Sequence, residues 1–283
     1  MTHAAHPQPV ALVTGASSGI GQATATALTA RGFRVFGTSR TPVPDPALPF
    51  ALLPLDVRSD ASVQDAVQHV LAAAGRIDVL VNNAGYAQLG GIEETSVADV
   101  QAQFDTNVFG VLRVTNAVLP IMRRQRAGRI INVSSLLGQV APPFMGVYAG
   151  SKFAVEGLTE ALRSELQPFG IHVSLVEPGN VKTNLEGRLA PSTVAEYDAA
   201  RQAMLNFARQ GVEQGMDAAD VARAIVGVAT APRPGLRHRV GRVSNVLITL
   251  KRLLPEPLFE RLLRRAFAAR QVAPAARQET AVT

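Results

Sequence analysis

The sequence predicts an α/β fold built on a doubly wound parallel sheet with helices on both faces. Short apolar runs rich in β-branched residues alternate with longer segments that have helical spacing and helix end signals. A glycine-rich turn at residues 14–21 separates the first apolar run from the first helical segment. Such alternation is typical of βαβ units, which form parallel sheets covered on both faces and bind ligands at the carboxyl ends of the strands.

Six strands are predicted in the first 180 residues, each as a short apolar run that ends at a turn signal. Pro54 lies within the third run and is typical of an edge strand, because proline cannot donate a ladder hydrogen bond. Four prolines between residues 42 and 49 mark the loop that precedes this strand. The predicted strands are 9–15, 33–39, 50–57, 77–85, 128–135 and 171–179.

Four helices are predicted between these strands. Gly32 and Gly75 end the first two, because glycine readily adopts the conformation that follows a helix. Ser59 and Asp60 are typical of the start of the second helix. Pro120 lies inside the third helix and predicts a kink there. The predicted helices are 19–32, 59–75, 97–127 and 147–168.

The composition favours one large globular domain. The chain has 283 residues, of which 47% are hydrophobic, and we expect a single domain over 1–243 and a helical tail over 244–283. There is no cysteine and the five histidines lack metal-ligand spacing, so we expect no disulfide framework and no metal. The first ten residues do not resemble a signal peptide, and the longest uncharged stretch contains polar residues and prolines. We therefore predict a cytoplasmic protein.

The glycine-rich turn "TGASSGIG" predicts a phosphate-binding site. Gly15, Gly19 and Gly21 leave the backbone open to a phosphate, and the helix that follows presents free N–H groups and a partial positive charge. A tight strand-to-helix connection without a ligand is the alternative. The strand–turn–helix context favours phosphate binding, although the spacing is GxxxGxG rather than GxGxxG.

Five further motifs follow in order: "NNAG" at 82–85, "NVFG" at 107–110, "INVSS" at 131–135, "YAGSK" at 148–152 and "PGNVKT" at 178–183. Together with the glycine turn they resemble the short-chain dehydrogenase/reductase family, which has a Rossmann fold, over about residues 8–240. The resemblance implies a nicotinamide cofactor, and a homodimer or homotetramer formed through the long helices that start near 97 and 147. It also implies that the cofactor contacts Gly15, Ser17, Ser18, Gly19, Ile20, Gly21, Asn83, Ala84, Gly85, Tyr148, Lys152, Pro178, Gly179, Val181 and Thr183.

The end of the second strand favours NADP over NAD. An NAD site needs an acidic residue there to bind the ribose hydroxyls, but this sequence has Ser39 and Arg40. A hydroxyl and a guanidinium suit the 2′-phosphate of NADP, which arginine can bind with two hydrogen bonds. The resemblance implies that Asp56 and Val57 hold the adenine. The alternatives are an Arg40 that points into solvent and an Asp56 that caps the next helix.

Tyr148 and Lys152 are the predicted catalytic pair. Residues four apart lie on one face of a helix, and a nearby ammonium is expected to lower the pKa of a phenol. An ordinary surface pair is the alternative, but the surrounding motifs favour catalysis. The resemblance implies that Tyr148 is the general acid/base, that Ser135 binds the reacting oxygen and that Asn107 relays protons. Ser134 would point the other way, because alternate residues of a strand face opposite sides.

These residues predict an NADP(H)-dependent oxidoreductase that interconverts a ketone or aldehyde and its alcohol. The segment 180–216 is expected to cap an apolar pocket for a hydrophobic small molecule, although its apolar residues equally fit a core. A cofactor-binding redox sensor without turnover is the alternative function, but a sensor needs no proton donor. The expected substrate contacts are Ser135, Val140, Phe144, Tyr148 and Leu185, beside Tyr86, Pro143, Leu189, Met204, Leu205 and Phe207.

The basic charge lies near the C-terminus. The chain carries +6 in total, but the part from Arg233 onward carries +8, so we expect no nucleic-acid-binding surface on the domain. Residues 247–270 are rich in leucine and arginine and predict two amphipathic helices separated by Pro255 and Pro257. Three roles remain open for them: closing over the substrate, packing on the body or a partner subunit, and touching an anionic membrane surface. Packing is favoured.

Overall fold

A seven-stranded parallel sheet forms the centre of the molecule in the computed structural model, which describes residues 8–183 and 187–271. The strand order is β11-β7-β6-β4-β1-β2-β3, and every neighbouring pair is parallel. This confirms the predicted doubly wound sheet, with β3 and its Pro54 at one edge. The strands are β1 (Val10–Val13), β2 (Arg34–Ser39), β3 (Ala51–Pro54), β4 (Val79–Asn82), β6 (Gly128–Val133), β7 (Ile171–Pro178) and β11 (Arg237–Val240).

The seventh strand, β11, was missed by the sequence analysis. Its residues are Arg-His-Arg-Val, so it lacks the apolar run that indicates a buried strand. It pairs with β7 at the edge of the sheet, where all four residues are half-buried. Edge strands tolerate charged residues because one side remains open to solvent.

Two small sheets lie outside the central one and were also not predicted. The strands β5 (Ala87–Leu89) and β9 (Gly187–Leu189) pair in parallel, as do β8 (Val181–Lys182) and β10 (Met216–Asp217). The first sheet ties the expected capping segment to the body, and the second joins the two ends of that segment to each other. Strands of two or three residues carry too few positions for a sequence period to be recognised.

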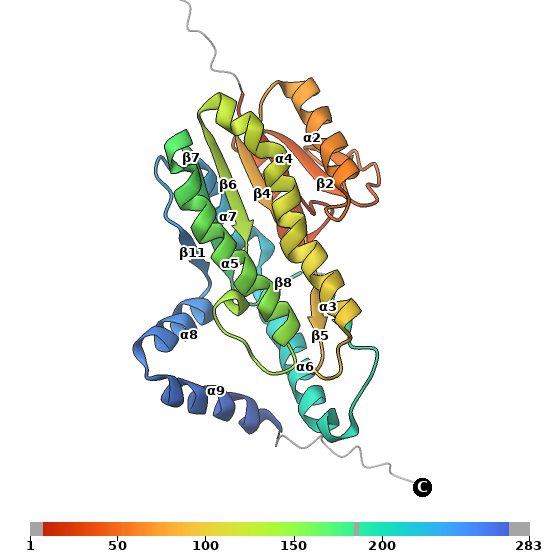
Figure 1. The fold of residues 1–283 in the computed structure, drawn as a ribbon, viewed down its shortest axis with the longest axis vertical. Helices are drawn as coiled ribbons and strands as arrows, with labels where there is room; N and C mark the ends of the chain where they lie inside the picture. The colour runs from red at the N-terminus through yellow and green to blue at the C-terminus, as the bar shows by residue number, and fades with distance from the viewer. Residues whose placement is uncertain (1–7, 184–186, 272–283) are drawn as a thin grey trace, which may run out of the picture.

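The helices cover both faces of the central sheet (Figure 1). Most ends match the predictions: Ser59 caps α2 by accepting a hydrogen bond from Ser62 N, and Gly75 ends it with φ +71°. The helices are α1 (Gly19–Ala30), α2 (Asp60–Ala74), α3 (Val97–Phe104), α4 (Gly110–Gln125), α5 (Gly146–Leu166), α6 (Asp198–Glu213), α7 (Ala218–Thr230), α8 (Arg242–Leu253) and α9 (Glu256–Gln271).

The helix predicted over 97–127 consists of three segments. The α-helices α3 and α4 are joined by a π-helical turn at Asp105–Phe109, while Pro120 lies inside the uninterrupted α4. The irregularity therefore falls at the "NVFG" motif rather than at the proline. Single π turns are common at functional sites because they redirect side chains.

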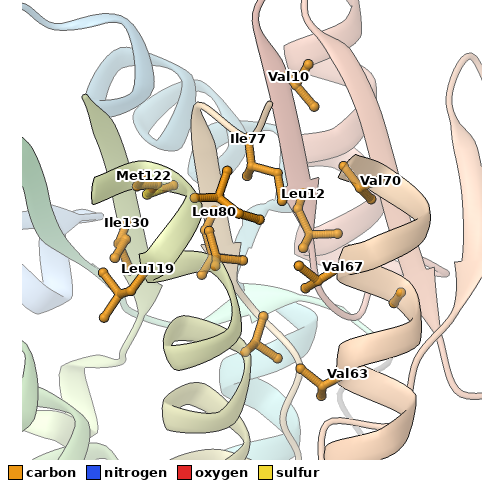
Figure 2. Packing of buried hydrophobic residues seen from close by; sticks show 14 of the residues in the cluster. Val10, Leu12, Val63, Val67, Val70, Ile77, Leu80, Leu119, Met122 and Ile130 are labelled. Carbon is orange, nitrogen blue, oxygen red and sulfur yellow. The ribbon is translucent and has the colours of Figure 1, made fainter. Parts of the chain in front are cut away.

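Alternate residues of each strand enter the two halves of the core. Val10, Leu12, Leu80 and Ile130 pack against α2, α4 and the end of α5, as Figure 2 shows for the first two helices. Their neighbours Ala11, Val13, Val81 and Ile131 pack against α1 and α7 on the other face. Because both faces of the sheet are covered, the residues that point to either face are apolar, and the strands appear in the sequence as continuous apolar runs.

The C-terminal helices α8 and α9 form an arm at the lower left of Figure 1, beyond the edge strand β11. They pack through Ile248 and Phe259 against Leu136 and Val140 of the body. No helix among the described residues is long and apolar enough to cross a membrane.

Candidate active site

The glycine turn lies between β1 and α1, at the carboxyl edge of the sheet. Gly15 and Gly19 have φ values of +66° and +55°, which side chains rarely adopt. A Cβ on Gly21 would lie 2.1 Å from the carbonyl oxygen of Gly15. The turn can therefore close only with glycine at these positions, and the α1 N-terminus opens onto it.

The "NNAG" motif holds this turn in place. Asn83 donates its side-chain amide to the carbonyl oxygens of Thr14 (2.9 Å) and Gly15 (3.0 Å). The Thr14 hydroxyl accepts hydrogen bonds from the backbone N–H groups of Asn83 and Ala84, at 2.9 and 3.0 Å. The ends of β1 and β4 are thus joined by four hydrogen bonds, which preorganise the turn.

A cavity of about 350 Å³ lies over the turn. Its lining contains most of the predicted cofactor residues: Gly15, Ser17, Ser18, Gly19, Ile20, Ser39, Arg40, Asp56, Val57, Asn83, Ala84, Gly85 and Thr183. It also contains residues that were not predicted to bind the cofactor: Thr41, Leu55, Arg58, Ala102, Thr106, Arg188, and Tyr86, which was expected beside the substrate. The other predicted cofactor residues lie outside this lining: Gly21, Tyr148, Lys152, Pro178, Gly179 and Val181.

Some of the missed residues had a signal in the sequence. Thr41, Arg58 and Tyr86 directly follow predicted positions, so a wider window around each motif would include them. Arg188 had none, because β9 is brought beside β5 only by the tertiary fold. Its guanidinium carbon lies 4.5 Å from the centre of the Tyr86 ring.

Two arginines and one carboxylate lie near one end of the cavity. Arg58 binds the Asp56 carboxylate through Nη2 (2.8 Å) and Nε (3.1 Å). This hydrogen bonding lowers the pKa of Asp56, and the charge of Arg40 contributes in the same direction. The Asp56 carboxylate is therefore engaged by a guanidinium, while Ser39 and Arg40 lie at the end of β2 as predicted.

Ser135 and Tyr148 are brought together at the carboxyl end of β6. Ser135 lies close enough to Tyr148 to lower the pKa of its phenol, and the Ser135 hydroxyl accepts a hydrogen bond from Leu137 N at 3.1 Å. Ser134 is buried and its hydroxyl has no hydrogen-bond partner among the described residues. The geometry thus separates the two serines as alternation along a strand predicts.

Lys152 lies one turn after Tyr148 on α5, with its Nζ 5.8 Å from the centre of the Tyr148 ring. The ammonium is buried and donates a hydrogen bond to the Val133 carbonyl oxygen at 2.8 Å. Burial lowers the pKa of Lys152 to about 8, and the nearby Glu156 carboxylate opposes this change.

The Tyr148 phenol has a raised pKa, contrary to the expectation that Lys152 lowers it. Burial raises the pKa of Tyr148 to about 12, and the nearby Ser135 only partly opposes this effect. Burial removes the phenolate from water and raises the pKa more than the neighbouring polar group lowers it. Tyr148 is thus a protonated group at neutral pH in this environment.

Asn107 lies on the π-helical turn and is buried. Its side-chain amide donates to the Tyr86 carbonyl oxygen and to the Ser151 hydroxyl, both at 3.1 Å. Its side-chain oxygen accepts from Tyr86 N at 3.2 Å. These bonds link the π turn to α5 within one helical turn of Tyr148 and Lys152, so Asn107 lies near these two residues.

A buried acidic pair lies one turn beyond Lys152. Glu156 accepts hydrogen bonds from Gln139 (3.0 Å) and Arg237 (2.9 Å), and Arg237 Nε lies 3.1 Å from Glu177 Oε1. Burial and the adjacent Glu156 raise the pKa of Glu177. The pair connects α5 to β7, β11 and the loop that follows Ser135, and the sequence analysis did not detect it.

The "PGNVKT" motif continues from β7 into β8. Gly179 N donates to the Val240 carbonyl oxygen at 3.0 Å, and Val181 is buried. A Cβ on Gly19 would lie 3.3 Å from the Thr183 side chain. The structure therefore places Thr183 beside the glycine turn, whereas Pro178 and Gly179 support the connection between strands.

The predicted substrate residues have different surroundings. Val140 is buried against Ile248 and Phe259, so it belongs to the contact with the arm. Phe144 is half-buried, has φ +59° and packs its ring edge-on to Tyr197 at 6.0 Å. Leu185 lies outside the described residues. Among the residues of the expected cap, Met204 is buried and Leu189 is exposed.

The fold and the preorganised turn define a doubly wound, dinucleotide-binding type of protein. The protein-family model described as short chain dehydrogenase matches residues 9–194. The chain belongs to the short-chain dehydrogenase/reductase family, whose members are oxidoreductases that use a nicotinamide cofactor and act on small molecules.

Relatives with assigned names and solved structures agree with this membership. The chain is 37% identical over 266 residues to the 3-ketodihydrosphingosine reductase of Bacteroides thetaiotaomicron, covering 92% of this chain and 98% of the relative. It is 38% identical over 271 residues to human retinol dehydrogenase 8, covering 88% and 86%. A short-chain dehydrogenase structure from Streptomyces avermitilis superposes with a TM-score of 0.79 at 34% identity, covering 94% and 99%.

Similar structures contain either form of the cofactor. A Burkholderia phymatum short-chain dehydrogenase/reductase in complex with NAD has a TM-score of 0.75 at 27% identity, covering 87% of this chain and 93% of that chain. The structure of ElxO with NADP bound has a TM-score of 0.69 at 26% identity, covering 82% and 97%. The choice between NAD and NADP must therefore be argued from this chain's own residues.

Proposed function

We propose that this protein is an NADP(H)-dependent oxidoreductase that interconverts a hydrophobic ketone or aldehyde and its alcohol. The observation that carries the proposal is the grouping of Ser135 and the Lys152 ammonium beside the buried Tyr148 phenol, with Lys152 Nζ 5.8 Å from the centre of the Tyr148 ring. A carbonyl oxygen between the two hydroxyls would accept two hydrogen bonds. Such donors stabilise the negative charge that develops on that oxygen during reduction.

The side chains can supply and replace one proton. Tyr148 holds its proton at neutral pH, because burial raises its pKa to about 12, and it can donate that proton to a developing alkoxide. Lys152, whose pKa is lowered to about 8, is positioned to return a proton to Tyr148 through water beside Asn107. The nicotinamide cofactor supplies the hydride when it is bound. Oxidation of the alcohol follows the same path in reverse.

The side chains near Asp56 support NADP as the cofactor. Ser39, Arg40, Thr41 and Arg58 all line that part of the cavity. The carboxylate of Asp56 is bound by Arg58. The Arg40 guanidinium and the hydroxyls of Ser39 and Thr41 suit a 2′-phosphate, which arginine recognises through paired hydrogen bonds, while Arg58 offsets the charge of Asp56.

A hydrophobic substrate is supported by two features. Ser135 is followed directly by Leu136, which packs with Val140, Ile248 and Phe259 in an apolar cluster. The relatives described above are named for a ketosphingoid base and for retinol, both of which are lipids with long apolar parts. We propose that the substrate class, rather than either particular molecule, is shared.

A self-associated state is also proposed, through the exposed sides of α4 and α5. Phe109, Phe153 and Leu158 are large apolar residues with substantial exposure in this region. Burial of such residues between two copies would remove apolar surface from water. Sedimentation velocity on the full chain tests this proposal, and a purely monomeric protein would contradict it.

The cofactor is tested by titrating the purified protein with NADPH and with NADH, following nicotinamide fluorescence. We expect tighter binding of NADPH, and loss of at least about tenfold of that preference in Arg40→Asp. Arg31→Asp is the matched control, because it makes the same charge change at an exposed position on the end of α1. Equal affinity of the wild type for both nucleotides would contradict the NADP assignment.

The reaction is tested with a panel of hydrophobic ketones and aldehydes under saturating NADPH. Tyr148→Phe removes one hydroxyl and should bind NADPH normally while losing at least about 100-fold in kcat. A wild type that binds NADPH tightly but turns over no member of the panel would support a sensor instead. A Tyr148→Phe variant as active as the wild type would refute the role of the phenol.

A further inference from the structure

The most deeply buried described residues of the arm lie on one side of each helix, although Leu250 of α8, at the border of the outer side, also packs on the body cluster. On α8 the buried residues are Ser244 and Ile248, and on α9 the buried residue is Phe259. Lys251 donates a hydrogen bond to the Gln139 carbonyl oxygen on the same side. The remaining sides of the arm face away from these contacts.

The outer side of α8 is apolar. Val243, Val246 and Leu253 are 55%, 59% and 75% exposed. At about 100° per residue they fall within an arc of about 80°, on the side opposite Ser244 and Ile248. A helix that only packs on its own body would carry polar residues there.

The outer side of α9 repeats this arrangement. Leu258 and Leu262 are 45% and 46% exposed and lie four residues apart, one above the other. Arg261 and Arg265 flank them, since each is displaced by less than a quarter turn from the leucine stripe. Together with the three α8 residues, these leucines make up the outer apolar stripe.

Positive charge is concentrated in the helices that carry the outer apolar stripe. Residues 242–265 contain six basic and two acidic side chains, a net charge of +4, which leaves only +2 on the other 259 residues. The basic residues are Arg242, Lys251, Arg252, Arg261, Arg264 and Arg265, and all six are exposed. Lys251 and Arg252 lie on the body side of α8, and Arg264 pairs with Glu260. The cations nearest the stripe are therefore Arg242, Arg261 and Arg265.

We propose that the outer apolar stripe of α8 and α9 docks on an anionic lipid surface. Apolar side chains between basic ones are the arrangement by which helices lie in the interface of a bilayer, with apolar groups among the acyl chains and cations at the headgroups. A second copy of this chain is a poor occupant, because it would bring +4 against +4. Docking needs no spanning helix, so it is compatible with the helices described above.

The docked arm would lie next to the reactive groups. Its inner side contacts Leu136, which directly follows Ser135 in the chain, and Val140, which lies four residues further on. The same two helices would therefore contact the lipid surface on one side and the loop after Ser135 on the other. If the proposed function holds, this arrangement lets a hydrophobic substrate pass between membrane and site, although docking itself does not depend on turnover.

The test is co-sedimentation of the full chain with vesicles. We expect binding to vesicles of equal parts phosphatidylcholine and phosphatidylglycerol, little binding to phosphatidylcholine alone, and weaker binding at high salt. The variant Leu253→Glu, Leu258→Glu, Leu262→Glu should lose at least about tenfold in partition to the anionic vesicles. Its matched control is Val43→Glu, Ile92→Glu, Val97→Glu, which makes the same charge change at exposed apolar positions outside the arm.

Three outcomes would overturn the proposal. In the first, the wild type does not bind the anionic vesicles. In the second, both triple variants lose vesicle binding equally. In the third, the arm variant loses self-association but binds the vesicles as the wild type does. Circular dichroism and NADPH titration of both variants show whether the fold and the cofactor site are intact. Because the readout is lipid binding, the docking proposal can fail while the proposed enzymatic activity stands, and the reverse.

Discussion

Replacing Lys152 with methionine should stabilise the protein while abolishing its activity. The ammonium is buried, and its pKa falls from 10.5 to about 8. A change of this size corresponds to about 3 kcal/mol of cost in the folded state at neutral pH. Methionine has a similar length and no charge, but it gives up the hydrogen bond to the Val133 carbonyl oxygen. That bond is worth about 1.5 kcal/mol, so we expect a net gain of about 1 to 2 kcal/mol at pH 7.

The pH dependence of this gain has a definite sign. Because the folded-state pKa of Lys152 is below the unfolded-state value, the cost is fully present below about pH 8 and disappears as pH rises toward 10.5. The wild type should therefore gain about 2 kcal/mol relative to the variant between pH 7 and pH 9.5. Other titrating groups are the same in both proteins and cancel in the difference.

The assay is urea unfolding of both proteins at fixed concentration across this pH range, without cofactor. Lys182→Met is the matched control, because Lys182 is exposed and pairs only loosely with Asp217 at 3.5 Å. Its effect should stay within about 0.5 kcal/mol at every pH. The reasoning is refuted if Lys152→Met is less stable than the wild type at pH 7, or if the two stability curves run parallel from pH 7 to 9.5.

Two further predictions concern the serines and the glycine turn. Ser135→Ala should lower kcat by at least about 100-fold, because it removes the hydroxyl beside Tyr148. Ser134→Ala should keep most of the activity. Steady-state kinetics that show equal losses for both variants would contradict the assignment of Ser135. Gly21→Ala should weaken NADPH binding by at least about tenfold, because its Cβ would lie 2.1 Å from the Gly15 carbonyl oxygen and force the turn open. Unchanged affinity in the fluorescence titration would show that the turn is less constrained than this distance implies.

Much of the central sheet could be predicted because its signals are local. The runs that became β1, β4 and β6 are apolar on both faces, and each is punctuated by glycine or a polar turn. The glycine turn was equally visible, since only its spacing and its position after a strand were needed. Strand β11 was not predicted because it contains two arginines and a histidine, and its place in the sheet depends on pairing with β7.

The predicted site residues were found mainly through their motifs, but their environments were not. The helical spacing of Tyr148 and Lys152 correctly placed both on one side of α5. The same spacing led to the wrong direction for the Tyr148 pKa, because spacing carries no information about burial. The cluster of Glu156, Glu177 and Arg237 could not be predicted from local spacing, because its members come from three elements far apart in the chain.

The sequence by itself determined the order of the first six strands of the central sheet, the glycine turn and the motifs from which the site residues were predicted. These features follow from short-range periodicity and from backbone conformations that few residues can adopt. The tertiary structure decided which groups are removed from water, how β9 and the arm meet the body, and which serine faces Tyr148. Those properties depend on contacts between residues far apart in the chain, and desolvation by such contacts sets the pKa values on which the proposed chemistry depends.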